Sequence, residues 1–254
     1  MTKLLQKKEL DNLNDCIHSY IECMEYYSKE MHKLKGAKGI CAYYLERYKS
    51  NWEGVSKILP NVTNSGLLPI CLISRVIIND FLYMYYVLKI SLDNNQIDES
   101  KFIDEWNKIN SDFIKALNNL LNMQVEAGFM THTEKTITLK NYQSNNTNIF
   151  DVDVSGKIKY KVDKFIFTEK VLNKIKDNEI KEAIICYKIF SQFIHPSGYT
   201  KIIQDNFPTE LFIRFANTFQ YTLVQTDQIL NLIGIADMEP IQKVRLKTNE
   251  HFPF

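Results

Sequence analysis

The sequence predicts an all-α protein, a bundle of about six helices with a small β-hairpin insertion at about residues 136–163. Two segments repeat apolar residues at alternating spacings of three and four, which is the pattern of an amphipathic helix. A third segment, 67–90, is apolar on almost every side, as expected of a helix at the centre of a bundle. We therefore expect residues 1–240 to form one helical domain with a β insertion at 129–166, followed by an irregular tail over 241–254.

The first repeating segment covers residues 10–34, and Gly36 and Gly39 are expected to end its helix. The second covers residues 102–123 and follows Asp98, a residue type that is typical of a helix N-cap. A long amphipathic helix buries its apolar stripe only against other elements, so each stripe requires a packing partner. The stripe residues are Leu10, Leu13, Ile17, Tyr20, Met24, Tyr27, Met31 and Leu34 in the first segment, and Phe102, Trp106, Ile109, Phe113, Ala116, Leu120 and Met123 in the second.

Three further helices are expected in the C-terminal half of the chain. A short one begins near Thr168, a second covers about 179–195, and a long one covers about 208–235. Pro196 disfavours helical backbone angles at the residue before it, so the second of these helices is expected to stop at His195. The long helix carries on its apolar side Leu211, Phe212, Phe215, Phe219 and Leu223.

Residues 129–166 depart from the helical pattern. Apolar and polar residues alternate on both sides of Ser155-Gly156, which predicts a β-hairpin with a short glycine-containing turn. The stretch TITLK at 136–140 is expected to add a third strand. The alternating apolar residues are Phe150, Val152 and Val154 before the turn, and Ile158, Tyr160 and Val162 after it.

Composition and charge exclude several classes of protein. A chain of 254 residues, 45% hydrophobic and 24% charged, is long and apolar enough to bury a substantial core. Its net charge of +1 excludes a strongly basic nucleic-acid binder of the usual kind, although a local basic patch is compatible with it. Five scattered cysteines without a CxxC pair are expected to be reduced and buried, and no apolar signal segment precedes the first helix. These features predict a cytoplasmic protein.

The apolar segment 67–90 is almost long enough to cross a membrane. It carries Arg75, Asn79 and Asp80 in its middle, however. Charged groups at the centre of a bilayer are costly, so the segment is expected to be a buried core helix rather than a membrane span.

No cofactor and no metal are expected. The sequence contains no GxGxxG, GxxxxGK[ST] or GxSxG motif, so neither a phosphate-binding loop nor a hydrolase nucleophile turn is indicated. His132 and Glu134 are assigned to a surface loop near the hairpin, and two potential ligands do not make a metal site. One row in the first segment has the spacing of metal ligands, but it lies opposite the apolar stripe and is expected to face solvent. That row is Asp15, His18, Glu22, Glu25, Lys29 and His32.

The remaining candidates are polar residues within apolar helices. Arg75 and Asp80 are five residues apart, about 140° around a helix, so each is expected to find its partner on another helix. Ser191 and His195 share one face of a later helix, and Lys188 stands one turn before Ser191. One interpretation is a structural network that ties helices together. The other is a general acid/base histidine beside a cation that stabilises phosphate charge.

Two stretches, SRVIINDFLYMYYVL at 74–88 and YKIFSQFIHPS at 187–197, resemble bacterial helical proteins related to the HEPN superfamily and to abortive-infection phage-defence proteins. The resemblance covers fewer than 30 residues. It implies a helical bundle, often homodimeric, and in active members a metal-independent RNA cleavage by an arginine and a histidine at the dimer interface, with four to six residues between the two. The matching histidine is His195. Lys188 stands where an arginine would fit the longest spacing, and a lysine lacks the planar fork that holds a phosphate with two hydrogen bonds.

Two hypotheses follow from these residues. The chain is either an RNA-directed, metal-independent endoribonuclease linked to phage defence or stress, or a non-catalytic helical interaction or sensor module that binds a partner protein or ligand. In the enzyme, His195 is the acid/base, Arg75 or Lys188 holds phosphate, and Ser191 orients the imidazole ring. In the module, Arg75, Asp80 and His195 are structural. A homodimer is expected in either case, because two long helices offer more apolar surface than one bundle obviously needs.

Overall fold

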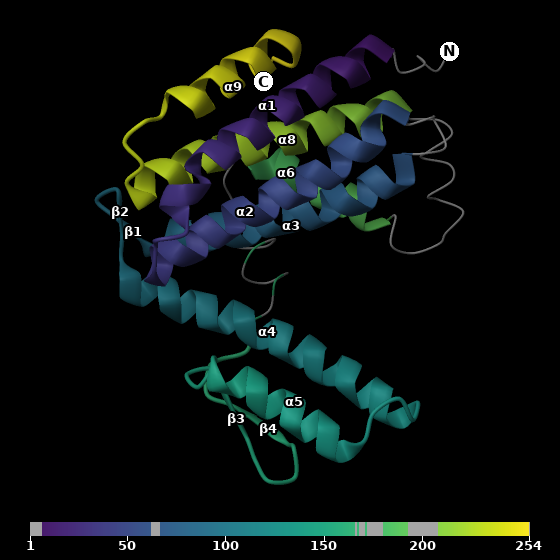
Figure 1. Ribbon diagram of the computed structural model, residues 1–254, viewed down its shortest axis with the longest axis vertical. Coiled ribbons are helices and arrows are strands. Elements are labelled where there is room, and N and C mark those ends of the chain that lie inside the picture. The colour runs from purple at the N-terminus through teal and green to yellow at the C-terminus, as the bar shows by residue number, and fades with distance from the viewer. Residues whose placement is uncertain are drawn as a thin grey trace. The chain divides into compact units, whose positions relative to one another are not determined.

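The computed structural model describes residues 7–61, 67–165, 167, 171, 180–192 and 208–253. Within these residues the chain forms eight α-helices and two short pairs of antiparallel strands (Figure 1). The all-α class is therefore confirmed, although the helices are more numerous than the sequence pattern predicts.

The chain divides into two compact units rather than the single domain that we expected for residues 1–240. Unit 1 consists of Met1–Tyr86, Asn94–Ile97 and Lys176–Phe254, and unit 2 consists of Val87–Asp93 and Asp98–Ile175. The expected β insertion is thus part of a separate helical unit with a core of its own.

Unit 1 is a helical bundle in which segments from both ends of the chain pack together. Helix α1 lies against α2 and α9, while α8 packs against α2, α6 and α9 (Figure 1). The aromatic and aliphatic side chains of the α1 stripe are buried from Leu13 to Met31, as predicted. Its helices are α1 (Lys7–Met31), α2 (Gly36–Ile58), α3 (Leu67–Ser91) as far as Tyr86, α6 (Lys181–Gln192), α8 (Pro208–Ile233) and α9 (Glu239–His251), with a 3-10 turn η1 (Leu59–Asn61) after α2.

The glycines after α1 have a different role from the one predicted. Helix α1 ends at Met31, and Gly36, at φ +60°, is already the first residue of α2. Gly39 lies inside α2, where a Cβ atom would come within 2.9 Å of the Leu34 carbonyl oxygen. The glycines therefore permit a tight turn between two packed helices, because neither position accommodates an ordinary side chain without strain or displacement.

Helix α3 is mostly buried, as predicted for the most apolar segment. Its Pro69–Ser91 stretch is long and apolar enough to cross a membrane, and 67% of its most apolar window is buried within the structure. The burial is incomplete on one side, where Leu72 and Val76 are each 40% exposed.

The C-terminal region corrects the prediction of an irregular tail over 241–254. Glu239–His251 form helix α9, with Pro240 in its first turn, where a missing backbone N–H removes no helical hydrogen bond. Ile241 and Val244 are buried. The preceding long helix agrees with its prediction: α8 starts at Pro208, and the apolar side chains named for it are all buried.

Unit 2 consists of two helices and a hairpin. Asp98 caps α4 (Glu99–Glu126), because its carboxylate accepts a hydrogen bond from the Lys101 backbone N–H at 3.1 Å. The hairpin pairs β3 (Phe150–Val152) with β4 (Ile158–Tyr160), with Phe150 opposite Tyr160 and with Gly156 at φ +78° in the turn. Ile114 of α4 packs with Ile149 and Phe150 in the core of this unit. A two-residue strand pair, β1 (Leu92–Asp93) and β2 (Gln96–Ile97), precedes α4.

Two predictions for unit 2 are wrong. The stretches HTE and TITLK are not a loop and a strand but parts of helix α5 (His132–Ser144). Its N-terminus is a capping box, in which Thr131 accepts from the Glu134 backbone N–H and Glu134 accepts from the Thr131 backbone N–H. The stripe of α4 is also only partly buried: Phe102 and Ile109 are buried, whereas Phe113, Leu120 and Met123 are 43%, 51% and 65% exposed.

Candidate functional site

Asp80 is a buried acid of α3, and its partner is Arg47 of α2. Asp80 is 2% exposed, and Arg47 holds it with two hydrogen bonds, from Nε to Oδ2 at 2.9 Å and from Nη2 to Oδ1 at 3.0 Å. Burial raises the pKa of Asp80 above its ordinary value, and the Arg47 guanidinium opposes this shift. The prediction that Asp80 pairs with a residue of another helix, and not with Arg75, is therefore correct, although Arg47 was not identified from the sequence.

A row of polar side chains on α8 connects the helices of unit 1. Thr226 is hydrogen-bonded to the Tyr20 hydroxyl at 3.2 Å, and Thr222 accepts from the Trp52 indole N–H at 3.4 Å. Gln225 accepts from the Tyr48 hydroxyl and donates to the Phe81 carbonyl oxygen at 3.1 Å. Because these polar atoms satisfy one another inside the core, the row is suited to fixing helix register rather than to chemistry.

Arg75 of α3 contacts Ser191 of α6, so its partner lies on another helix, as expected, although Ser191 was not named as that partner. Arg75 Nε donates to Ser191 Oγ at 3.3 Å, and the guanidinium carbon lies 5.5 Å from the ring centre of Tyr187. The Ser191 hydroxyl donates in turn to the Tyr187 carbonyl oxygen at 2.6 Å. Lys188 is exposed on the same helix, and His195, the proposed acid/base, lies outside the described residues. The Ser191 hydroxyl, which was expected to orient the His195 ring, thus contacts Arg75.

The structure also tests the other residues that the sequence singled out, namely the charged row of α1 and the cysteines. The charged row of α1, from Asp15 to His32, is exposed, as expected. The described residues contain no group of three or more His, Cys, Asp or Glu side chains placed to hold a metal ion. The five cysteines are all buried, as predicted, and form no disulfide. The helix predicted near Thr168 lies outside the described residues.

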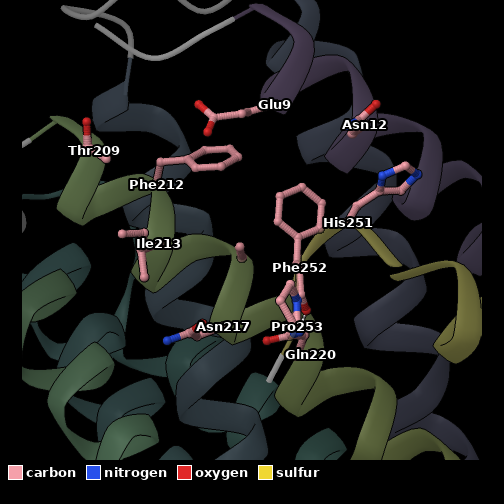
Figure 2. A pocket seen from close by; sticks show the side chains of 11 residues that line it. Glu9, Asn12, Thr209, Phe212, Ile213, Asn217, Gln220, His251, Phe252 and Pro253 are labelled. Atoms are coloured by element: carbon pink, nitrogen blue, oxygen red, sulfur yellow. Dashed lines mark hydrogen bonds between the residues drawn. The ribbon is translucent and has the colours of Figure 1, made fainter. Parts of the chain in front are cut away.

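One cavity in unit 1 has the composition of a binding site. It has a volume of about 390 Å³ and lies among the start of α1, the first half of α8 and the end of α9 (Figure 2). Its apolar walls include Phe212 and Phe252, whose ring centres are 6.1 Å apart with an angle of 62° between the ring planes. The described residues that line it are Glu9, Asn12, Thr209, Phe212, Ile213, Ala216, Asn217, Gln220, His251, Phe252 and Pro253.

Hydrogen bonds hold the far wall of this cavity in place. The Gln220 side-chain amide donates to the Phe252 carbonyl oxygen, and the Phe252 backbone N–H donates to the Thr248 carbonyl oxygen at 2.8 Å. Gln220 is only 4% exposed, so it joins the end of α9 to α8 from within the protein. Among the described residues, the lining combines amide, carboxylate, imidazole and hydroxyl groups with aromatic walls.

The sequence interpretation missed this cavity because it assigned residues 241–254 to an irregular tail. Pro240 followed by a mixed apolar and charged stretch is a usable signal for a helix start, and this signal identifies α9. The approach of α9 to the start of α1 depends on contacts between residues far apart in the sequence. No local sequence pattern predicts such contacts.

Comparisons with protein-family models, with curated proteins and with solved structures give no match.

Proposed function

We propose that this protein is a non-catalytic sensor module that binds a small molecule in the cavity formed by α1, α8 and α9. The cavity itself is the observation that carries the proposal, because its volume and its mixture of aromatic walls and a few polar groups are typical of ligand sites. It also joins the two ends of the chain, so an occupant would contact the first helix and the last one together.

The polar residues singled out from the sequence support a structural role. Asp80 is neutralised within the core by Arg47, and Arg75 is engaged by a hydroxyl group and an aromatic ring. Contacts of this kind between helices are typical of residues that fix the packing of a bundle.

We expect a ligand of the cavity to raise the thermal stability of the full chain. A molecule present at about one hundred times its Kd stabilises the folded state by about 2.7 kcal/mol, which raises Tm by several degrees. A library of small polar and aromatic molecules, measured by thermal shift, tests this. The shift should disappear in Ala216→Met, which fills the cavity, and persist in the matched control Val224→Met, which places the same side chain on α8 outside it. If the ligand still raised the Tm of Ala216→Met, it would be binding outside this cavity, and the proposal would be contradicted.

An RNA-directed, metal-independent endoribonuclease is the second candidate function. The hydrogen bond between Arg75 and Ser191 favours it, because this bond places a guanidinium beside the helix that leads to His195. The resemblance to HEPN-related proteins suggests the same chemistry, with His195 as acid/base and Arg75 or Lys188 as the phosphate ligand.

We predict that the purified chain does not cleave single-stranded RNA in the presence of EDTA. His195→Ala and Arg75→Ala are then expected to change stability only, by about 1 kcal/mol for Arg75, whose described partner is a hydroxyl. Gel analysis of labelled RNA tests this directly. Cleavage by the parent that vanishes in a well-folded His195→Ala variant would establish the enzyme and overturn the sensor proposal.

We also propose that the protein associates with a second copy of itself through α4. The exposed residues Phe113, Leu120 and Met123 are spaced by seven and three, the spacing of a seam by which helices of two chains pair. Light scattering should give a dimer at micromolar concentration. Replacing Leu120 and Met123 together with glutamate should give a monomer, whereas Lys115→Glu, outside the seam, should not. A monomeric parent protein would refute this proposal.

A further inference from the structure

We infer that the outer edge of β4 binds an extended acidic segment of another protein, which adds a third strand to the hairpin of unit 2. Binding at this edge requires neither a ligand in the cavity of unit 1 nor pairing through α4. The support comes from the hydrogen bonding of the two hairpin edges, from the charge beside β4 and from the face that packs against the core of unit 2.

The register of the hairpin decides which backbone groups of β4 point outward. The Lys161 backbone N–H donates to the Ile149 carbonyl oxygen at 2.8 Å, so these two residues form a hydrogen-bonded pair. Bonded and non-bonded pairs alternate along an antiparallel ladder. The N–H and C=O groups of Ile158 and Tyr160 therefore point away from β3, toward the outer edge of the hairpin.

The two edges of the hairpin differ in how their outward groups are satisfied. On β3, the Phe150 N–H donates to the Asn146 carbonyl oxygen at 3.4 Å, and the Val152 N–H donates to Gln143 Oε1 at 3.3 Å. Helix α5 and the turn after it thus cover this edge (Figure 1). On β4, the part of the chain that the structure describes supplies no partner for the outward groups. Tyr160 is 38% exposed, so this edge is open to an incoming strand.

The side chains beside this edge carry positive charge. Lys159 lies on the exposed face of the hairpin, opposite Asp151, and Lys157 lies on the same face. Asp151 is already paired with Lys161 at 2.9 Å, and Asp153 Oδ1 accepts hydrogen bonds within the turn. A strand added beyond β4 would lie beside Lys159, on the side away from Asp151. Opposite charges on neighbouring strands attract, so an acidic residue is favoured at that position.

The same charge disfavours a second copy of this chain at this edge. If two β4 strands paired antiparallel, the lysines of one would lie beside the lysines of the other. Like charges on neighbouring strands destabilise a pairing. Lysines on an edge strand also discourage association with uncharged strands. An acidic strand is therefore the occupant that the edge selects.

The opposite face of the edge determines the alternate residues of the bound segment. Ile158 packs against the core of unit 2 on this face. The pKa of Tyr160 is raised, first by burial and then by the Asp112 carboxylate. An acid of the bound segment would lose water here and would meet Asp112, so an apolar residue is favoured instead. Because successive side chains of a strand alternate between faces, the expected sequence alternates acidic and apolar residues.

Two peptides, acetyl-Val-Glu-Val-Glu-Val-amide and acetyl-Val-Lys-Val-Lys-Val-amide, differ only in the charge of one face. Titration of the full chain, followed by NMR, should show the acidic peptide binding about tenfold more tightly than the basic one. The backbone amides of Ile158 and Tyr160 should exchange hydrogen more slowly when the acidic peptide is bound. Lys159→Glu should reverse the preference. Lys140→Glu, the same change at an exposed position of α5, should keep it.

Tyr160→Pro tests the backbone contact separately from the charge. Proline removes the outward N–H of residue 160 but no bond to β3, and a strand tolerates proline where the N–H faces solvent. This variant should bind neither peptide measurably. Tyr160→Val also lacks the ring but keeps the N–H, so it should still bind the acidic peptide. Thermal unfolding confirms that each variant is folded.

Several outcomes would overturn the inference. Equal binding of the two peptides, or an acidic preference that survives Lys159→Glu, would show that the edge lysines do not select the segment. Binding that persists in folded Tyr160→Pro would show that the peptide does not extend the hairpin. If neither peptide binds, the inference fails, whereas the proposals for the cavity and for α4 stand. A parent dimer that becomes monomeric in Tyr160→Pro would show that the edge pairs with a second copy instead.

Discussion

Arg47→Ala is expected to lower the free energy of unfolding by about 3–5 kcal/mol, because it leaves the carboxylate of Asp80 buried without its partner. Urea denaturation followed by far-UV circular dichroism measures this loss, and Tm should fall by on the order of 10 °C. Arg75→Ala is the matched control, because it removes the same side chain from a described contact with a hydroxyl and a ring instead of an acid. Equal losses in the two variants would contradict the assignment of Arg47 as the partner of Asp80.

The pH dependence of the Arg47→Ala variant provides a second test. Arg47 opposes the effect of burial on Asp80, so its removal should raise the pKa of that carboxyl further. A group whose pKa is raised in the folded state contributes stability that is lost as pH rises through that folded pKa. The difference in the free energy of unfolding between Arg47→Ala and the parent protein should therefore be largest near neutral pH and should shrink as pH falls. Asp80→Asn in the Arg47→Ala background should recover part of the loss at neutral pH.

The parts of the fold that the sequence predicts are those with strong periodicity or a specific cap. The stripes of α1 and α8, the apolar segment of α3 and the Asp98 cap all follow from local patterns. Helix α2 was missed because its buried side mixes small residues and a serine with two tyrosines and a tryptophan, which weakens the apolar signal. In α5, the threonines of TITLK favour a strand, and the capping box at Thr131 outweighs them.

Less of the candidate site than of the fold could be predicted from the sequence. The sequence indicates that Arg75 needs a partner on another helix, since a charged side chain in an apolar helix requires one, but it does not identify Ser191 as that partner. The identity of Arg47 as the partner of Asp80 depended on recognising α2. The cavity depended on recognising α9 and on its long-range approach to α1, so neither Phe252 nor Glu9 could be selected from spacing alone.

The packing of α2 against α8 leads to the second large effect. Trp52 is fully buried, and its ring centre lies 4.9 Å from that of Phe219 and 5.5 Å from that of Phe215. Trp52→Ala is expected to cost about 3–5 kcal/mol, because the neighbouring side chains can only partly fill the space that the indole leaves. Circular dichroism is the appropriate signal, since the replacement also removes one of the two tryptophans of the chain.

Trp52→Phe separates the contribution of packing from that of the hydrogen bond. Phenylalanine keeps most of the apolar volume but loses the indole N–H that donates to Thr222, a contact at 3.4 Å that should contribute about 1 kcal/mol. A Phe variant as unstable as the Ala variant would show that the hydrogen bond, not the packing, joins α2 to α8. Trp52 does not line the cavity, whereas α8 supplies six of its residues. A ligand should therefore stabilise the folded Trp52→Phe variant as much as it stabilises the parent, because the core contact and the binding site lie on different sides of the same helix.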